Sequence, residues 1–164
     1  MARLGTGTAR HPFHIRAVEA DDLPAVVALD NVVTGIEKAD YWREMFERYG
    51  ASRGGQRFFL ISENSPARGA AGILGLVIGE VRAWEFGSPP CGWVFDIAVA
   101  PDLRLEGLGT ALLDAIADRF RAAGVDKMRT MVSRDNHVLL SFLRSQGMMA
   151  GPYIQLEKDL DEDS

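Results

Sequence analysis

The chain has 164 residues, of which 47% are hydrophobic and 25% charged, and its formal net charge at pH 7 is −5. A chain of this length suits one domain, which buries roughly two thirds of the surface that the unfolded chain exposes. The net negative charge gives no general electrostatic attraction to nucleic acid or to an anionic membrane, and it mildly favours a basic substrate.

The composition also argues against several kinds of segment and site. No apolar run approaches the roughly 20 residues that a membrane span requires, and the first residues lack the hydrophobic centre of a signal peptide. We therefore expect a cytoplasmic protein. Cys91 is the only cysteine, which excludes an internal disulfide and a cysteine-rich zinc site. The three histidines are too scattered to indicate a metal site.

The first third of the chain combines a strand pattern with helical patterns. Residues 1–11 show no hydrophobic period, so we expect a flexible leader. Alternation over Phe13–Val18 predicts a strand, and the apolar spacing after Glu19–Asp22 predicts a helix. A second helix is predicted over Val32–Tyr49. Its aromatic residues are candidates to line a substrate entrance.

The middle of the chain predicts three strands. Arg57–Ser62 and Ile73–Val81 are expected to pair as a hairpin, and a loop over residues 85–92 follows them. The nearly continuous apolar run Trp93–Val99 is typical of a strand buried on both faces. Asp96 interrupts this run, and a charge at such a position needs a hydrogen-bond partner or a raised pKa.

The last third of the chain predicts two helices and two strands. Helical spacing covers Gly107–Ala123, where Gly124 can end the helix, and the next strand is predicted over Lys127–Val132. Asp135 or Asn136 can cap a helix that ends at Gln146. Pro152–Lys158 is predicted to be the last strand. This order of elements is α+β in class, with a mixed sheet.

The most informative stretch is Val99–Leu113, in which a buried strand runs through a turn into a helix opened by glycines. Gly107 and Gly109 have no Cβ to keep a ligand away, so the free N–H groups of the first helical turn can point at an anion. Arg104 adds a positive charge. The pattern predicts a phosphate cradle.

Two other glycine loops are excluded by their spacing. A P-loop requires Gly-Lys-Ser/Thr at its end, and none is present. A dinucleotide-binding loop requires a third small residue where this chain has Leu112, and we expect no βαβ unit to start at this loop.

The stretch resembles the acyl-CoA signature of the GCN5-related N-acetyltransferases (GNAT), written Arg/Gln-x-x-Gly-x-Gly/Ala. Arg104, Gly107 and Gly109 occupy the signature positions. Val99 and Pro101 match the Val-x-Pro with which the preceding strand of the family ends.

Two further segments extend the resemblance. Asp96–Pro101 matches the strand before the signature, and Asn136–Gly147 is similar to the second cofactor segment of the family. The resemblance implies a GNAT-like fold, with a mixed central sheet of about six to seven strands between helices in three layers. Residues 12–160 would form one acyl-CoA-binding catalytic domain, followed by an acidic tail over 161–164.

The resemblance also implies a cosubstrate, acetyl-CoA, and no metal. Its pantetheine arm would lie along the strand before the cradle, where an unpaired buried amide costs about 1–3 kcal/mol. The backbone of Ile97, Ala98 and Val99 is therefore the candidate partner of the arm and of the acetyl carbonyl. The other cofactor-binding candidates are Arg104, Leu105, Glu106, Gly107, Leu108, Gly109, Thr110 and Asn136.

Two positions depart from the family's pattern. Glu106 brings a carboxylate near the phosphates, so we expect its side chain to turn to solvent or to pair with Arg104. Leu143 replaces the tyrosine that usually protonates the departing sulfur. A thiol titrates near about 8.5 and can leave as a thiolate, so an acid is not strictly required. The candidate substitutes for the acid are Tyr153, Ser141 and Cys91.

Transfer to an amine requires the nucleophile to lose a proton, and an alkyl amine titrates near about 10. Glu80 and Asp96 are the candidate catalytic bases. Glu80 either marks the exit of its strand into water or projects into the cleft, and Asp96 is either paired structurally or catalytic. Glu85 is interpreted as a solvated loop residue.

The sequence therefore predicts an N-acetyltransferase that moves an acetyl group from acetyl-CoA to a primary amine of a small molecule, protein or peptide. A noncatalytic acyl-CoA-binding module remains an alternative, as do a longer acyl chain and a hydroxyl acceptor. Neither nucleic acid nor a membrane is an expected partner. The acceptor and a homodimeric state are left open.

Overall fold

The computed structural model describes residues 13–52, 54–63, 72–104 and 106–160. The chain falls into two compact units, unit 1 up to Met131 and unit 2 from Val132 onward. The predicted leader and acidic tail lie outside the described residues. None of the described helices is long and apolar enough to cross a membrane.

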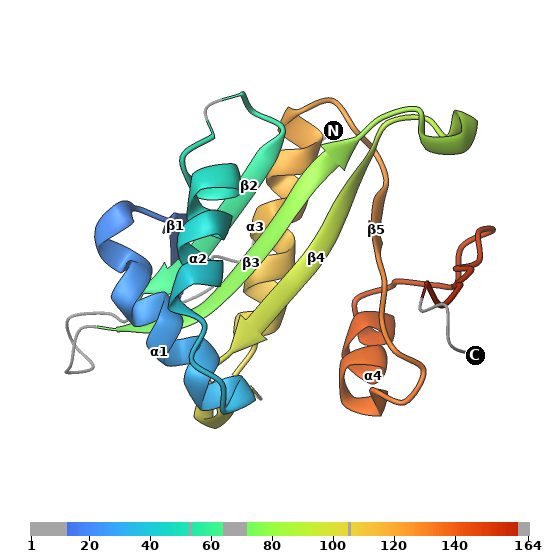
Figure 1. The fold of residues 1–164 in the computed structure, drawn as a ribbon. Coiled ribbons are helices and arrows are strands. Elements are labelled where there is room, and N and C mark those ends of the chain that lie inside the picture. Colours follow the sequence, from blue (N-terminus) through green and yellow to red (C-terminus); the bar gives the residue numbers. More distant parts are fainter. Residues whose placement is uncertain (1–12, 53, 64–71, 105, 161–164) are drawn as a thin grey trace, which may run out of the picture. The chain divides into compact units, whose positions relative to one another are not determined.

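Unit 1 is built on a mixed sheet whose described strands follow the order β1-β2-β3-β4-β5. The pairs β1–β2, β2–β3 and β3–β4 are antiparallel, whereas β5 is parallel to β4 (Figure 1). Because α3 connects these two parallel strands, the expectation that no βαβ unit starts at the glycine turn is wrong. The strands are β1 (His14–Ala17), β2 (Arg57–Glu63), β3 (Ile73–Arg82), β4 (Cys91–Val99) and β5 (Met128–Thr130). The mixed α+β sheet is confirmed, with five described strands rather than six or seven.

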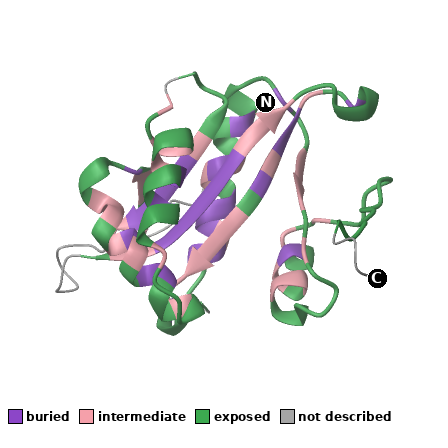
Figure 2. Ribbon diagram, in the orientation of Figure 1, coloured by how far each residue is buried: buried purple, intermediate pink, exposed green. Residues whose placement is uncertain are grey.

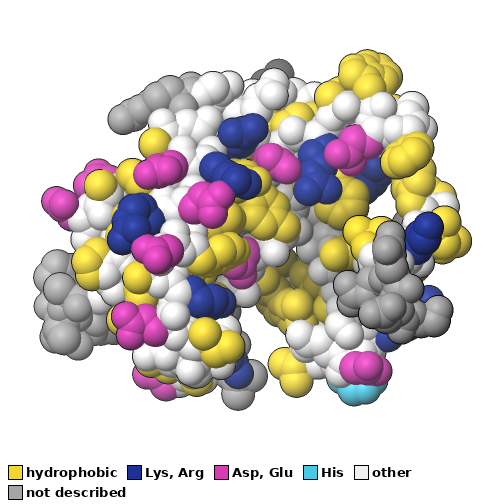
Figure 3. Space-filling view, in the orientation of Figure 1, with side chains coloured by type: hydrophobic (Ala, Val, Ile, Leu, Met, Phe, Trp, Pro, Cys, Tyr) yellow, Lys and Arg dark blue, Asp and Glu magenta, His cyan; other side chains and the backbone are white. Residues whose placement is uncertain are grey.

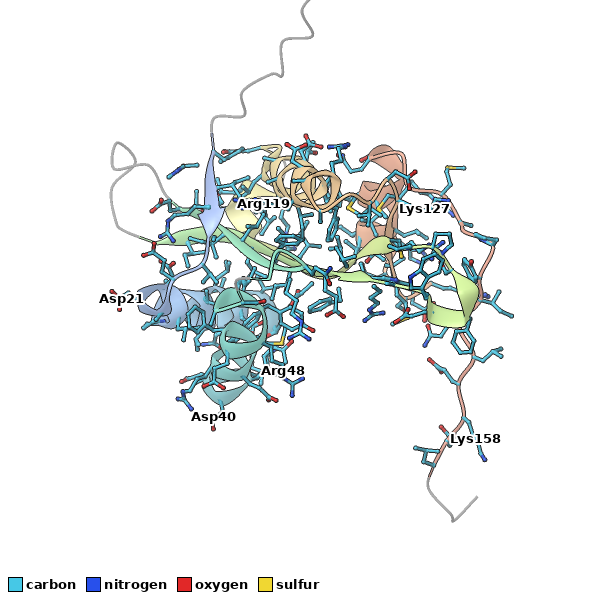
Figure 4. The ribbon with its side chains drawn as sticks, turned by 90° about the horizontal axis from the view of Figure 1, so that it is seen from above. Asp21, Asp40, Arg48, Arg119, Lys127 and Lys158 are labelled. Atoms are coloured by element: carbon cyan, nitrogen blue, oxygen red, sulfur yellow. The ribbon has the colours of Figure 1, made fainter. Side chains whose placement is uncertain are left out.

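Helices lie on both faces of this sheet. Figure 4 shows α1, α2 with the labelled Asp40 and the following turn with Arg48 on one face, and α3, with Arg119, on the other, so the three predicted layers are present in unit 1. The helices are α1 (Leu23–Thr34), α2 (Ala39–Met45), α3 (Leu108–Ala122) and, in unit 2, α4 (His137–Ser145). Short 3-10 turns cover Ala20–Asp22, Glu85–Gly87 and Pro101–Leu103, and a π turn covers Phe46–Gly50.

Two apolar layers join the helices to the sheet, and Figure 2 shows the buried residues gathered in β2, β3 and the inner side of α3. On the α3 face, side chains of the helix lie where Cβ atoms of Gly75, Gly79 and Gly92 would stand, so these glycines let α3 approach closely. The layer under α1 and α2 contains Val26, Leu29, Trp42, Met45, Phe59, Ile61, Leu76 and Ile78.

The continuous helix predicted over Val32–Tyr49 is wrong. α1 runs on to Thr34 and stops at Gly35, whose φ of 74° lies in the left-handed region that glycine adopts without strain. α2 then starts at Ala39 and passes into the π turn. The break separates the two helices by a short exposed connection.

The strand predicted over Pro152–Lys158 is also wrong, because the structure assigns no strand there and residues 151–160 are exposed. Ile154 and Leu156 alternate as in a strand but are 82% and 84% exposed. Alternation only selects a face. A strand also needs a neighbouring backbone for its N–H and C=O groups, and the hydrophobic pattern does not supply one.

Gly79→Ala tests the close contact between α3 and the sheet. A Cβ at Gly79 would lie 2.5 Å from the Trp93 carbonyl oxygen and 2.9 Å from Phe120 Cζ. The carbonyl belongs to the paired backbone of β4, so we expect the free energy of unfolding in urea to fall by about 1–3 kcal/mol. Gly54→Ala is the matched control, because a Cβ there meets nothing within 4 Å. A similar loss in both variants would contradict the explanation.

Candidate active site

The turn between β4 and α3 has the geometry predicted for a phosphate cradle. Gly107 is the N-cap of α3, and its φ of 84° is strained for a residue with a side chain. The helix begins at Leu108, so the N–H groups of its first turn have no helical carbonyl to bond. Such N–H groups and the helix dipole favour an anion, so this geometry is compatible with the predicted phosphate cradle.

The predicted phosphate-binding residues differ in their exposure, and Leu105 lies outside the described residues. Leu108 is completely buried against the Gly75 region of β3, so its side chain anchors the helix while its backbone stays at the turn. The exposure of Glu106 agrees with the expectation that its side chain turns to solvent. The exposed residues are Arg104, Glu106 and Gly107, and the more buried ones are Leu108, Gly109 and Thr110.

The strand that leads into this turn has an open edge. β5 pairs only with Gly92–Val94, so none of the described strands covers the outer edge of β4 beyond them. The predicted burial of Trp93–Val99 on both faces is therefore wrong: Phe95 is exposed, and Asp96–Val99 are only partly buried. The backbone groups of Ile97, Ala98 and Val99 lie along this edge, where an extended ligand could pair with them.

A β-bulge in β4 determines which face of the sheet Asp96 occupies. Gly79 pairs with Val94 and Ile78 pairs with Asp96, so Phe95 is an extra residue between the two pairs. Directly opposed residues point to the same face, which puts Asp96 with Ile78 on the side of α1 and α2. Without the bulge, the strict alternation of the strand would send Asp96 to the side of α3.

Asp96 satisfies both requirements that the sequence set for it. Burial raises the pKa of Asp96 to about 6, and the nearby Asp30 carboxylate adds to the rise. Lys38 and a hydrogen bond from the Ile97 backbone N–H act in the opposite direction. A carboxylate with this pKa is ionised at neutral pH and basic enough to accept a proton.

The sequence analysis missed Asp30 and Lys38, which lie close to Asp96. Asp30 on α1 is 5% exposed, and its Oδ2 accepts a hydrogen bond from Trp42 Nε1 at 2.9 Å. The same oxygen lies 3.1 Å from Lys38 Nζ. Asp30 follows Val26 by one helical turn, so a carboxylate on the apolar face of α1 was the signal that could have revealed the site.

Glu80, the other candidate base, is held by two guanidinium groups. Its Oε1 accepts a hydrogen bond from Arg82 Nε at 3.1 Å, and its Oε2 lies 3.9 Å from Arg57 Nε. Glu80 pairs with Trp93 across the strands, and Arg82 also lies over the Trp93 ring at 4.8 Å. Both carboxylates therefore occupy the same face of the sheet; Glu80 is paired with arginines, whereas the nearby cation that acts on Asp96 is Lys38.

Aromatic residues from the α2 region lie near these carboxylates; that they line a substrate entrance stays a prediction. The Tyr49 ring lies 4.9 Å from Phe95, the bulge residue. Burial raises the pKa of the Tyr41 hydroxyl, and the Asp96 and Asp30 carboxylates raise it further. Figure 3 shows acidic and basic side chains interspersed with hydrophobic ones over this face.

The candidates of unit 2 are described within that unit alone. Asn136 is the N-cap of α4, where its Oδ1 accepts a hydrogen bond from the Leu139 N–H at 3.1 Å, so the predicted cap is confirmed. Its contact with a cofactor stays a prediction. Leu143 is buried in unit 2, and the substitutes Ser141 and Tyr153 are exposed. Cys91 is buried at the start of β4.

Comparison with known proteins identifies the family. Residues 23–148 match the sequence profile of the Acetyltransferase (GNAT) family. The chain belongs to this family. The resemblance that the sequence suggested is therefore confirmed, and the matched residues include the bulge, the open edge of β4 and the glycine-headed start of α3.

Curated relatives of this GNAT protein are acetyltransferases. L-2,4-diaminobutyric acid acetyltransferase of Nocardia farcinica is 40% identical over 63 residues, which cover 38% of the chain and 31% of that relative. The match thus spans less than a third of that enzyme. A second relative is the [ribosomal protein bS18]-alanine N-acetyltransferase of Escherichia coli K12, 28% identical over 135 residues, which cover 81% of the chain and 78% of the relative.

Solved structures share the GNAT fold at low sequence identity. An aminoglycoside N-acetyltransferase in complex with CoA has a TM-score of 0.74 at 16% identity, over 91% of this chain and 95% of that one. The ribosomal-protein-S18-alanine N-acetyltransferase of Escherichia coli has a TM-score of 0.62 at 20% identity, over 82% of this chain and 76% of that one. These likenesses establish the fold.

Asp96→Asn tests the burial of Asp96 through the pH dependence of stability. The pKa of Asp96 in the folded protein, about 6, is above its ordinary value of 3.8, so ionisation of the carboxyl destabilises the fold as the pH rises between these two values, and the full effect is present above about pH 6. At about pH 3 the carboxyl is protonated in both states and this effect is absent. We expect the variant to raise the free energy of unfolding at about pH 8, on the order of 2 kcal/mol, and to change it little at about pH 3.

Urea titrations at the two pH values measure this difference. Asp21→Asn, at an exposed position of the same unit, serves as the control and should show no such pH-dependent gain. An effect of Asp96→Asn that is the same at both pH values would refute the assignment.

Proposed function

We propose that the protein transfers an acetyl group from acetyl-CoA directly to a primary amine of a small molecule, protein or peptide. The observation that carries the proposal is the continuous path from the open edge of β4 through Pro101 to the glycine-headed start of α3. One end of this path is the β4 edge, whose backbone groups beyond Val94 pair with none of the described strands. The other end is the first turn of α3, whose N–H groups are the proposed anion site. A thioester with an amide-containing arm and a diphosphate fits both ends.

Acetyl-CoA is the cosubstrate of acetyltransferases of this family. In the proposed arrangement, the N–H groups at the start of α3 bind the diphosphate, and the Arg104 guanidinium adds charge. The backbone of Ile97, Ala98 and Val99 bonds the arm and orients the acetyl carbonyl, whereas the role of Asn136, which belongs to unit 2, stays a prediction. Among the described residues, no group of three or more side chains could hold a metal ion.

Asp96 is the proposed base. The amine nitrogen attacks the acetyl carbonyl carbon, its proton passes to Asp96 directly or through water, and the carbon–sulfur bond breaks as the thiolate leaves. Asp96 suits this role better than Glu80, because two arginines already occupy the oxygens of Glu80. Glu80 then acts as the centre of an ion-pair network at the wall of the site.

The departing sulfur needs little protonation. A thiolate with a pKa near about 8.5 is a tolerable leaving group, and backbone N–H groups along the β4 edge can stabilise the charge that develops. Leu143 in place of the usual acid is consistent with this route. It also favours the second candidate function, a noncatalytic CoA-binding module, which would bind acetyl-CoA without releasing its thiol to any amine.

The names of the relatives support an amine as the acceptor. By these names, the relatives and the structural neighbour act on diaminobutyric acid, on the alanine of a ribosomal protein and on aminoglycosides. Each of these compounds presents an amino group, although they differ greatly in size. The negative net charge of the chain and the carboxylates of the α1–α2 face agree with a cationic acceptor.

Gly107→Val tests the cradle. A side chain at φ 84° strains the turn and shifts the N–H groups that would bind the diphosphate, so we expect the dissociation constant of CoA to rise about tenfold or more in calorimetry. Gly124→Val is the matched control at the opposite end of the same helix, with a φ of 86° and equally open surroundings. It should show similar strain and unchanged CoA affinity. Equal CoA affinity in the two variants would remove the cradle from the site.

Asp96→Asn and Glu80→Gln together test the base. With acetyl-CoA and a panel of amines, thiol release by the wild type should rise with pH through about 6, because Asp96 must lose its proton to act. Asp96→Asn should lower kcat by about 10²–10⁴-fold, abolish the rise of the rate with pH and leave the KM for acetyl-CoA nearly unchanged. Glu80→Gln should keep the rise of the rate with pH. If the wild type releases no thiol with any amine, the noncatalytic module replaces the proposed enzyme.

A further inference from the structure

The ammonium group of Lys38 lies in surroundings built for a cation. Its Nζ is 3.1 Å from Asp30 Oδ2 and 5.5 Å from the centre of the Tyr41 ring. The Asp30 side chain is only 8% exposed, whereas 35% of the Lys38 side chain is exposed. The lysine side chain is therefore partly open to solvent, while the carboxylate with which it pairs is buried.

The carboxylate does not depend on Lys38 for its position. Asp30 Oδ2 also accepts the hydrogen bond from Trp42 Nε1, and Trp42 is 1% exposed within the core. The Tyr41 ring is likewise fixed, since it packs edge-on against Trp42 at 5.1 Å. A buried carboxylate and an aromatic ring would thus keep their places if the flexible lysine side chain moved away.

This arrangement lies beside the proposed base. Asp96 on β4 interacts electrostatically with both Asp30 and Lys38, and Tyr41 interacts with both carboxylates. The neighbourhood therefore holds two carboxylates for one lysine. A molecule with two amino groups could satisfy both carboxylates, with one amine at each.

We propose that Asp30 and the Tyr41 ring form an ammonium-binding site that Lys38 fills in the absence of an acceptor, and that preferred acceptors carry a second ammonium group which takes its place. The inference rests on the proposed function, because the first amine of such an acceptor is the one that Asp96 deprotonates. Lys38 is then a reversible occupant that leaves when the acceptor enters. The acceptors belong to the class of aliphatic diamines and polyamines.

The site is tested first without any acetyl transfer. Lys38→Ala removes three methylenes and the ammonium, which together correspond to n-propylammonium, so this ion is the probe. We expect n-propylammonium chloride to raise the Tm of Lys38→Ala at concentrations about tenfold lower than those needed for the wild type. Sodium chloride at equal ionic strength and propan-1-ol should not reproduce the effect.

Two further variants control for a general effect of charge. Arg43→Ala removes the cation that pairs with Asp40 at 2.7 Å on the exposed side of α2, and it should not create a response to n-propylammonium. Asp30→Asn combined with Lys38→Ala should abolish the response. The proposal fails if Lys38→Ala responds no better than the wild type, or if sodium ions act as well as the probe.

The acceptor preference is tested next with 1,3-diaminopropane against n-propylamine. We expect the wild type to show a kcat/KM about tenfold or more higher for the diamine, and Asp30→Asn to lose this preference. Equal kcat/KM for the two amines in the wild type would overturn the assignment of the acceptor class. A protein that acetylates no amine but whose Lys38→Ala variant binds n-propylammonium would contradict the proposed function and leave the ammonium site standing.

Discussion

The single extra residue in β4 is the constraint on which the rest of the site depends. Strict alternation would put the Asp96 carboxylate against α3, among the side chains that fill the space over the sheet glycines. The bulge at Phe95 instead turns it to the face covered by α1 and α2. There it lies near Asp30, with Lys38 and Tyr41 around it and the Tyr49–Phe95 ring pair at the edge. One inserted residue thus brings a strand, two helices and their connection together around one carboxylate.

The other face of the same sheet fixes the anion site. Glycines in β3 and β4 leave no room for side chains, so α3 lies directly on the strands and the buried Leu108 anchors its first turn. The helix start therefore stands at a fixed distance from the end of β4, with only the short turn after Pro101 between them. Rigid placement of this kind is what a site needs if a diphosphate bound at one end is to deliver a thioester to a base at the other.

The sequence was most informative where chemistry and backbone conformation demand the same residue. Gly107 and Gly124 adopt left-handed conformations at the two ends of α3, so the bounds of this helix could be predicted from spacing alone. The pairing partner of a strand leaves no such trace, and Pro152–Lys158 alternates correctly without belonging to a described sheet. The bulge was equally hidden, because an inserted Phe95 looks like one more residue of an apolar run. Asp30 could have been found from its place on the apolar side of α1, whereas its bond to Trp42 depends on how α2 folds back.

The part of the β4 edge that none of the described strands pairs with affects how the protein behaves in solution. Backbone donors and acceptors in such a row offer a template for any passing extended chain, and proteins usually protect them. Here the natural cover would be the cosubstrate itself. In the proposed arrangement, acetyl-CoA would cover this edge as well as supply the acetyl group, and its concentration would then raise the free energy of unfolding by mass action.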